Sequence, residues 1–226
     1  MARSLWPPRR LFALLDFATR NLGLSNSSKS QSPEPAADLP TMTAVGRRVY
    51  LRKHERSDRG QFVTWYMDPE IADLLRHDLS PLTPIQARGY FDSIVMPASH
   101  RGLCWAIVEL GTDRLVGSTA LVDLEDDRGS ALFRIVIGEK DTWNQGFGTE
   151  ATGLVLDQAF GRLGRRRVNL EVFAHNPRAQ KAYIRAGFQR TGQHSEWVSR
   201  AHRQIDVIEM SISREQWLAT TDSAES

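Results

Sequence analysis

A glycine-rich segment supplies the first residues that could carry chemistry. Residues 143–151 read W-N-Q-G-F-G-T-E-A and lie between an apolar run and a segment with helical spacing. Glycine lets backbone N–H groups approach an anion without a Cβ in the way. The start of the following helix adds unpaired N–H donors and its positive end. The segment is therefore a candidate diphosphate site, although glycine-rich turns also begin many helices that bind nothing.

The same glycines fit a second class of ligand. Residues 146–151 satisfy the dinucleotide fingerprint G-x-G-x-x-A, and Glu171 follows where that motif has its acidic residue. In dinucleotide-binding folds the fingerprint follows its strand directly and opens a parallel sheet. Here residues 138–145 intervene, and an antiparallel meander is predicted ahead of them. Both features argue against a nicotinamide dinucleotide enzyme.

A second segment follows after one predicted strand. Residues 176–188 read N-P-R-A-Q-K-A-Y-I-R-A-G-F. The two segments together resemble the GNAT acyltransferase superfamily, whose motifs are Q/R-x-x-G-x-G/A at a helix start and N-x-x-A-x-x-x-Y-x-x-x-G-F after the next strand. The resemblance covers roughly residues 45–217. Trp143 departs from it, because it occupies the position that usually holds Gln or Arg.

The resemblance implies transfer of an acetyl group from acetyl-CoA, the expected co-substrate, directly to a primary amine. It also implies that the strands before and after the glycine-rich segment splay apart, with the pantetheine arm between them. No metal is expected. The resemblance assigns the contacts with acetyl-CoA to backbone groups of the strand, Ile135, Val136 and Ile137, and to backbone N–H groups of the glycine-rich segment, Gln145, Gly146, Phe147, Gly148 and Thr149.

Two side chains of the second segment are expected to act on the substrates. The Asn176 amide can both donate and accept, which suits a pantetheine amide or the acetyl group, but Asn is also a frequent N-cap of a helix. By the family spacing, the Tyr183 phenol would act as general acid and protonate the departing thiolate. The alternative for Tyr183 is a core aromatic on the apolar face that it shares with Ala179 and Ala182.

The sequence does not name a general base. Asp123, Glu125, Asp126 and Asp127 cluster after a predicted strand and could face the acceptor, but a carboxylate-rich turn is usually just solvated. The six histidines are scattered without metal-ligand spacing. Cys104 alternates within an apolar strand, as a core residue does. A non-catalytic CoA-binding or regulatory module on the same fold is therefore kept as the alternative function.

Further residues resemble the branch that contains the ribosomal-protein N-terminal acetyltransferases. Residues 65–70 read W-Y-M-D-P-E and match its W-x-x-D-P-E opening, and residues 115–117, 137–138 and 213–217 also fit it. Tyr183 departs from this branch, since many of its N-terminal protein acetyltransferases lack the tyrosine. The acceptor thus stays open between a protein N-terminus and a small-molecule amine.

Hydrophobic periodicity predicts the elements that position these residues. Fold class α/β (α+β) is expected, as a mixed, mostly antiparallel sheet flanked by helices. Residues 192–204, before the last strand, form either a substrate lid or an ordinary hairpin arm. Strands are predicted at 49–53, 103–110, 115–122, 131–137, 168–172 and 208–212, and helices at 61–77, 83–95, after the glycine-rich segment and from Asn176 to a Gly187 cap.

Composition bounds the classes of protein and partner. The chain has 226 residues, and its 29 basic against 27 acidic residues give a net charge of +2, without the clustered basic excess of a nucleic-acid binder. A single cysteine excludes an internal disulfide framework. No run of about 18 apolar residues predicts a membrane span. A cytoplasmic enzyme with no nucleic-acid or membrane partner is expected, and its oligomeric state is not predicted.

Three regions are expected along the chain. Residues 1–41 combine a short helical stripe with a stretch rich in Ser, Pro and Ala, which predicts a flexible extension and linker, and Met42 is a candidate for the natural start. Residues 42–217 form the acetyltransferase-like domain. Residues 218–226 form a C-terminal tail.

Overall fold

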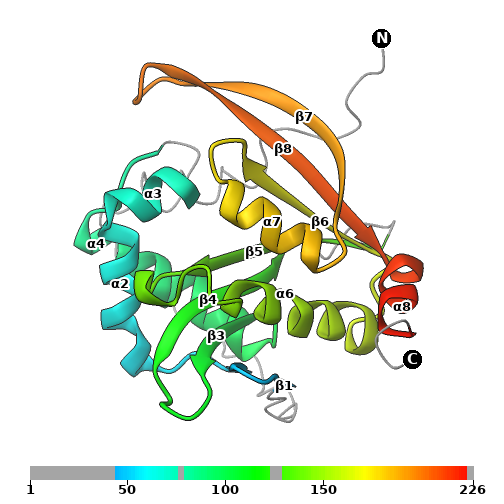
Figure 1. Cartoon of the computed structure of the whole chain (residues 1–226). Helices are drawn as coiled ribbons and strands as arrows, with labels where there is room; N and C mark the ends of the chain where they lie inside the picture. The colour runs from blue at the N-terminus through cyan, green and yellow to red at the C-terminus, as the bar shows by residue number, and fades with distance from the viewer. Residues whose placement is uncertain (1–43, 76–78, 123–128, 223–226) are drawn as a thin grey trace, which may run out of the picture.

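The described strands form one eight-stranded sheet in the order β1-β2-β3-β4-β5-β6-β8-β7 (Figure 1). A computed structural model describes residues 44–75, 79–122 and 129–222. All neighbouring strands are antiparallel except β5 and β6. This confirms the predicted mixed, mostly antiparallel sheet. The strands are β1 Ala44–Val45, β2 Val49–Arg52, β3 Cys104–Glu109, β4 Leu115–Val122, β5 Ser130–Ile137, β6 Arg167–Phe173, β7 Gln189–Val198 and β8 Arg203–Ser213.

Helices cover both faces of the sheet (Figure 1). The largest apolar core lies between the sheet and the helices α6 and α7, and smaller clusters lie between the sheet and the N-terminal helices. On the first face are α6 Phe147–Asp157, its extension η4 Gln158–Arg162, and α7 Pro177–Arg185. On the other are η1 Arg56–Asp58, α2 Arg59–Met67, α3 Pro69–Leu75, α4 Pro84–Tyr90, η2 Phe91–Val95 and α5 Met96–His100; η3 Lys140–Thr142 precedes α6, and α8 Arg214–Asp222 follows β8.

The two parallel strands separate partway along their length. β5 pairs with β6 only at Ser130, Ala131 and Leu132. Residues 133–137 of β5 stay paired with β4, while β6 pairs along its whole length with β8 on its far side. One backbone edge of residues 133–137 is therefore free of a neighbouring strand among the described ones, which is the separation that the resemblance implied.

The N-terminal helices differ from their predicted bounds. The helix expected over 61–77 is broken at Asp68, whose ψ of 122° is extended. Because a residue before proline is disfavoured in the helical region, Pro69 ends α2 and begins α3. The helix expected over 83–95 does begin at a Thr83 cap, but it continues through η2 and α5 to His100. Pro97 does not stop it, since proline is tolerated in the first turn of α5.

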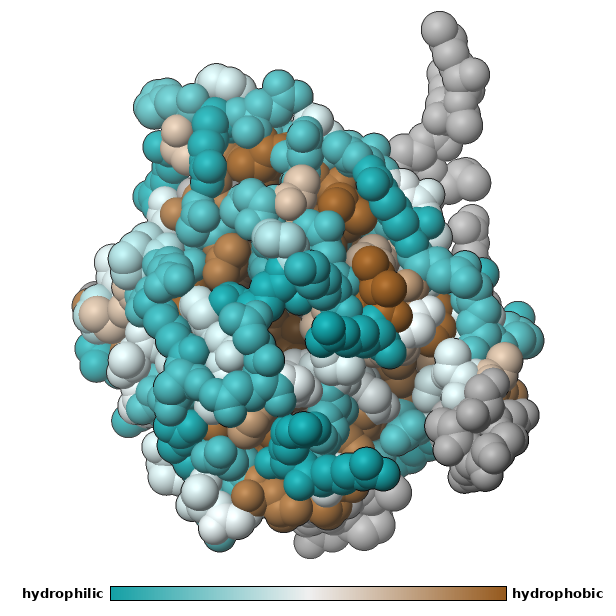
Figure 2. All heavy atoms as spheres, viewed as in Figure 1, coloured by the Kyte–Doolittle hydropathy of each residue, from teal (hydrophilic) through white to brown (hydrophobic). Residues whose placement is uncertain are grey.

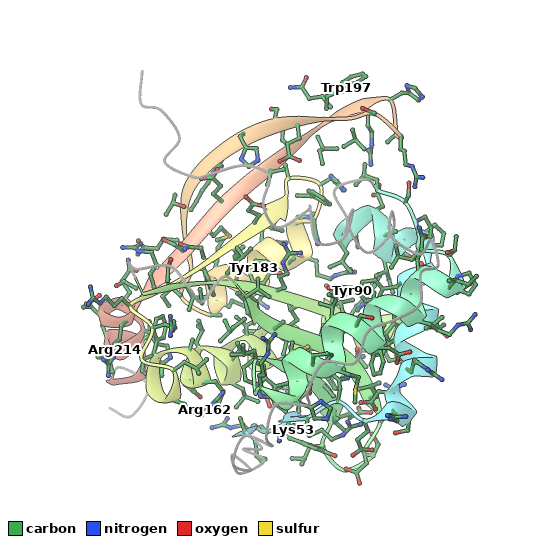
Figure 3. All side chains as sticks on the ribbon, turned by 180° about the vertical axis from the view of Figure 1, so that it is seen from behind. Lys53, Tyr90, Arg162, Tyr183, Trp197 and Arg214 are labelled. Carbon is green, nitrogen blue, oxygen red and sulfur yellow. The ribbon has the colours of Figure 1, made fainter. Side chains whose placement is uncertain are left out.

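β7 and β8 form a long hairpin that extends beyond the rest of the sheet (Figure 1). Residues 192–204 make up most of its outer half, so the hairpin alternative is the one that forms. Near the tip, Arg203 forms an ion pair with Asp73 of α3. Trp197 is 66% exposed close to the same tip (Figure 3).

The end of the described chain is helical. Ser213 and Gln216 cap α8 reciprocally, with the N–H of Ser213 donating to Gln216 Oε1 at 2.8 Å. α8 continues past residue 217, where the domain was expected to end. None of the described helices has the length and apolar character needed to cross a bilayer. The predicted leader, the candidate start Met42 and the acidic cluster at 123–127 lie outside the described residues.

Candidate active site

The glycine-rich segment forms the loop between β5 and α6. Gly146 is the N-cap of α6 and has a φ of +87°, a left-handed conformation that favours glycine. The N–H of Glu150 donates to the carbonyl of Gly146 at 3.0 Å. The N–H groups of Phe147, Gly148 and Thr149 therefore precede the first helical hydrogen bond. They lie at the positive end of an 11-residue helix, which is the arrangement that binds phosphate groups.

The loop has room for a ligand beside its backbone. A Cβ placed on Gly148 would meet nothing closer than Ile137 Cγ1 at 3.5 Å, an ordinary van der Waals distance. Packing of the chain itself therefore does not require glycine at 148, whereas a closely approaching ligand would. The Gln145 side chain donates to the carbonyl of Asp141, which leaves its backbone N–H for the predicted role.

The negative charge of Glu150, in the first turn of α6, is compensated by groups of residues 48 and 49 at the start of β2. Its Oε1 accepts from the backbone N–H groups of Arg48 and Val49 at 2.7 and 3.1 Å. Its Oε2 pairs with Arg48 Nη1 at 3.5 Å. The same guanidinium lies 3.8 Å from the point where a Gly146 Cβ would be. A carboxylate in the first turn is thus compensated by a cation next to the loop.

Trp143 connects the loop to α7. Its indole Nε1 donates to the carbonyl of Ile137 at 2.8 Å. Its ring supports the guanidinium of Arg178, whose Cζ lies 3.5 Å from the ring centroid. The residue that replaces the usual Gln or Arg is therefore an aromatic platform for a cation carried by the next helix.

Two cations lie at this tryptophan, and only one of them has carboxylate partners. Lys140 Nζ contacts Asp68 at 2.8 Å and Glu70 at 2.6 Å, and the hydrogen bond that it donates to Asp68 raises the pKa of Lys140. Arg178 has no carboxylate within ion-pair distance in the described part of the chain; burial lowers its pKa, and the more distant charge of Glu70 opposes that shift. A half-buried guanidinium without a paired carboxylate can bind an anionic ligand.

The W-Y-M-D-P-E segment contacts residues 138–140, which lead into the glycine-rich loop. Trp65 Nε1 donates to Glu139 Oε1 at 2.8 Å, and Asp68 contacts Lys140. Gly138 lies flat against the Trp65 indole, since a Cβ there would come within 2.0 Å of its Cδ2. The segment thus fixes residues 138–140 by packing and hydrogen bonds.

The three predicted contacts on β5 lie in its free stretch. Ile135, Val136 and Ile137 pair with β4 on one edge, and β6 has diverged from the other. The carbonyl of Ile137 already accepts the Trp143 indole, so only its second lone pair is available. The side chain of Val136 packs against Trp65, on the α2 face of the sheet.

Tyr183 points from α7 into the larger core. Its side chain is 9% exposed and lies edge-to-face with Phe133, with ring centroids 6.1 Å apart. Phe188 lies beside it at 6.0 Å. Burial raises the pKa of the phenol above its ordinary value. Within the described residues the hydroxyl has no hydrogen-bond partner, so this core aromatic presents an uncommitted phenol beside β5 (Figure 3).

Asn176 is the N-cap of α7. Its Oδ1 accepts from the backbone N–H of Ala179 at 3.1 Å, which confirms the capping alternative. A contact of its Nδ2 is not found among the described residues, so a second, ligand-binding role stays a prediction. α7 ends at Arg185 with Ala186 as its C-cap, and Gly187, the glycine predicted to cap the helix, follows with a φ of +95°.

The profile of the acetyltransferase (GNAT) domain family matches residues 48–189 of this chain. That span is more than half of the chain and contains the loop, β6 and α7. The chain belongs to the GNAT acetyltransferase family.

Two curated relatives of this GNAT acetyltransferase come from Bacillus subtilis. The uncharacterized N-acetyltransferase YycN is 29% identical over 144 residues, which are 63% of this chain and 84% of YycN. The uncharacterized N-acetyltransferase YoaA is 29% identical over 93 residues, which are 41% of this chain. The match spans about half of YoaA, 51% of its length.

Solved structures share the fold. A GNAT acetyltransferase from Bacillus anthracis superposes with a TM-score of 0.66 at 16% identity, covering 77% of this chain and 99% of that one. Spermidine N-acetyltransferase from Vibrio cholerae, in complex with CoA and spermine, gives 0.64 at 22% identity, covering 75% and 98%. A proposed ribosomal-protein-serine acetyltransferase from the same organism gives 0.59 at 19% identity, covering 77% and 98%. At these identities the likeness shows the fold alone.

The surroundings of Cys104, of the possible metal ligands and of Glu171 bear on the remaining alternatives that the sequence left open. Burial raises the pKa of the Cys104 thiol to about 12, as expected for a core cysteine. The described residues contain no group of three or more His, Cys, Asp or Glu arranged to hold a metal ion. Glu171, the acidic residue of the dinucleotide fingerprint, faces Glu209 in the middle of an antiparallel pair. With one parallel pair among the described strands, the sheet is not of the dinucleotide-binding type.

Proposed function

We propose that this GNAT acetyltransferase transfers an acetyl group from acetyl-CoA directly to a primary amine, with Tyr183 as general acid. The divergence of β5 and β6 carries the proposal, because it leaves a free backbone edge between the glycine-rich loop and an uncommitted phenol. Acetyl-CoA supplies an activated thioester when bound.

Three sets of groups on this chain fit acetyl-CoA. The N–H groups of residues 145–149 would hold its diphosphate, and Arg178 would add a positive charge beside them. The free edge at Ile135, Val136 and Ile137 would pair with the amide groups of the pantetheine arm. Asn176 Nδ2 would donate to the same arm while Oδ1 caps α7. Apolar side chains lie between hydrophilic ones on the face of the molecule that carries α6 and α7 (Figure 2).

Tyr183 would hold the proton that the departing sulfur needs. The phenol is buried against Phe133 and Phe188, and burial disfavours its anion. It therefore stays protonated at working pH and can donate its proton from the hydroxyl oxygen. The acetyl group is already activated, so the remaining task of the chain is to position the amine and manage protons.

The acceptor is proposed to be a primary amine, either a small molecule or a protein N-terminus. The relatives of known name support both: one acts on spermidine, and another is a proposed ribosomal-protein-serine acetyltransferase. A non-catalytic CoA-binding module is the second candidate, which the uncommitted Tyr183 phenol argues against.

The first experiment is calorimetric titration of the full chain with acetyl-CoA, with NADH as control. Micromolar binding of acetyl-CoA alone supports the proposal, and absence of binding contradicts it. Release of CoA thiol is then followed with spermidine and with a short peptide that has a free N-terminal serine. Binding without thiol release from either acceptor would favour the non-catalytic module.

A further inference from the structure

A buried chain of polar groups crosses the α2 face of the sheet and has no place in the mechanism above. His54 follows β2 and is 4% exposed. Its Nε2 lies 2.9 Å from Ser118 Oγ on β4, and its Nδ1 lies 3.2 Å from Asp58 Oδ2 on η1. Ser118 and Asp58 are 6% and 5% exposed. A serine, a histidine and an aspartate are thus linked in the order in which proton relays are built.

The surroundings fix the direction in which this chain can pass a proton. Both terminal nitrogens of Arg52 donate to Asp58 at 2.8 Å, and the N–H of Glu55 donates at 2.9 Å. The carboxylate of Asp58 is therefore held in its charged form, and it must accept the Nδ1 proton of His54. The tautomer that follows leaves Nε2 as an acceptor for the Ser118 hydroxyl. Ser118 Oγ then keeps lone pairs for an outside donor.

Ser118 lies beside the free stretch of β5. It is the register partner of Val136, and directly opposed residues of an antiparallel pair point to the same face. That face is the one covered by α2, α3 and η2, where Val136 packs against Trp65. Tyr183 and Phe133 belong to the opposite face. The free stretch of β5 thus has a phenol on one side and a Ser-His pair on the other.

Aromatic rings on the α2 face suit a cationic acceptor. Tyr66 and Tyr90 are half-buried, with ring centroids 5.4 Å apart, and Phe62 stacks on Tyr66 at 4.3 Å. The faces of such rings attract an ammonium group. Ser118 lies on the same face, opposite Val136 of β5.

We propose that Ser118 and His54 remove the proton of the acceptor ammonium, with Asp58 as the residue that positions His54. One N–H bond of the ammonium breaks as an O–H bond forms at Ser118 Oγ. The original Ser118 O–H breaks as an N–H bond forms at His54 Nε2. The positive charge moves from the ammonium to the imidazolium, which the Asp58 carboxylate stabilises, and the proton later leaves to solvent. This inference rests on the proposed acetyltransferase function and names the base that the function needs.

The groups that surround His54 and Ser118 come from β2, β3, η1, α2, η2 and α5. Asp58 from η1 and Arg52 from β2 are the charged ones. Cys104 from β3 contacts Ser118 at 3.9 Å, and Ser99 from α5 accepts from the His54 backbone N–H at 2.7 Å. α2 and η2 present the rings of Phe62 and Phe91.

The test compares His54→Gln with wild type in the thiol-release assay, using spermidine or the serine peptide, whichever the wild type acetylates. Glutamine can donate to Asp58 and accept from Ser118, so it keeps the hydrogen bonds but cannot hold a proton. The expected result is a fall in kcat of about 10- to 100-fold at pH 7 with unchanged acetyl-CoA affinity. The loss shrinks above the pKa of the acceptor amine, because the amine then arrives neutral.

Two serine variants complete the test. Ser118→Ala is expected to match His54→Gln in rate and pH profile. Ser99→Ala, the control, removes a hydrogen bond to the His54 backbone and is expected to keep the wild-type pH profile. Wild-type kcat in His54→Gln, or an equal rate loss at every pH, overturns the relay. If wild type itself releases no thiol from either acceptor, the proposed function fails instead.

Discussion

The two faces of the sheet at residues 133–137 of β5 differ in how their polar side chains are hydrogen-bonded. On the α6–α7 face, two aromatic rings, Phe133 and Phe188, pack against the phenol of Tyr183, which has no hydrogen-bond partner among the described residues. On the α2 face, His54, Asp58 and Ser118 are buried with their polar groups bonded to one another. One face therefore presents an unmet donor, and the other presents a satisfied network.

The phenol on the α6–α7 face is left to form its hydrogen bond with a ligand, whereas the polar groups on the α2 face already have hydrogen-bond partners within the fold. Burial among apolar rings raises the pKa of Tyr183 and keeps the phenol neutral. On the other face, the Arg52 and His54 hydrogen bonds outweigh burial, so the pKa of Asp58 falls well below its usual range and the carboxylate stays charged. Removing the Tyr183 hydroxyl is thus expected to cost catalysis alone, whereas removing a group of the network on the α2 face is expected to cost stability as well.

The largest expected effect is on stability, in Asp58→Asn. The substitution leaves the half-buried Arg52 guanidinium without its carboxylate, and breaking a pair whose carboxylate is buried costs about 3 kcal/mol. Because the folded-state pKa is depressed, this contribution is present above about pH 4 and is lost as pH falls toward the folded-state pKa. The difference in the free energy of unfolding between wild type and variant, measured in urea between pH 3 and 7, should therefore be smaller at pH 3 than at pH 7.

Asp92→Asn is the matched control. Its pair with Arg59 has a similar separation of 3.0 Å, but both side chains are about half exposed, at 50% and 49%. Such pairs contribute about 0–1 kcal/mol. Equal losses in the two variants would contradict the distinction between a buried network and a surface pair.

Tyr183→Phe is expected to have the next largest effect, on turnover. Loss of the hydroxyl should lower kcat by about 10- to 1000-fold, since the general acid is removed while the ring packing stays. The melting temperature and the affinity for acetyl-CoA should change little, because the hydroxyl bonds to no described residue. Turnover at the wild-type level would exclude the acid role and leave Tyr183 as a core aromatic.

Sequence patterns predicted the α6–α7 side far better than the α2 side. The loop, the N-cap at Asn176 and the cap at Gly187 all depend on neighbours a few residues away. Hydrophobic alternation predicted the meander for the same reason. The break at Asp68 was missed because the helical spacing of 61–77 outweighed Pro69, and the run through η2 into α5 was missed beyond residue 95.

Long-range side-chain contacts gave no signal in the sequence. His54 and Ser118 are 64 residues apart, and neither belongs to a motif. Arg178 falls at a variable position of its motif, and only the fold brings it onto Trp143. The W-Y-M-D-P-E segment was visible, but its bonds to Glu139 and Lys140 needed the tertiary structure.

Arg178→Gln should weaken acetyl-CoA binding by about 10-fold, because a charge-assisted contact of roughly 1.5 kcal/mol would be lost. Calorimetric titration measures the change. Lys140→Gln removes a cation from the same tryptophan, but Asp68 and Glu70 already compensate that charge. We expect a change of about 3-fold or less in this control. Equal losses from the two substitutions would indicate a general field effect and no direct contact from Arg178.

The Asn176 side chain combines a structural role with a proposed ligand-binding role, and the expected effects of replacing it are the smallest. Asn176→Ala removes the N-cap of α7 and should lower the free energy of unfolding by about 1 kcal/mol. Asn176→Ser keeps a capping oxygen but has no amide N–H, so its stability should stay close to that of wild type.

If the amide also binds the pantetheine arm, the serine variant should still bind acetyl-CoA about 3-fold more weakly, the effect of one modest hydrogen bond. Wild-type affinity in the serine variant would leave Asn176 with its capping role alone, and would place the recognition of acetyl-CoA on the backbone of β5 and the glycine-rich loop.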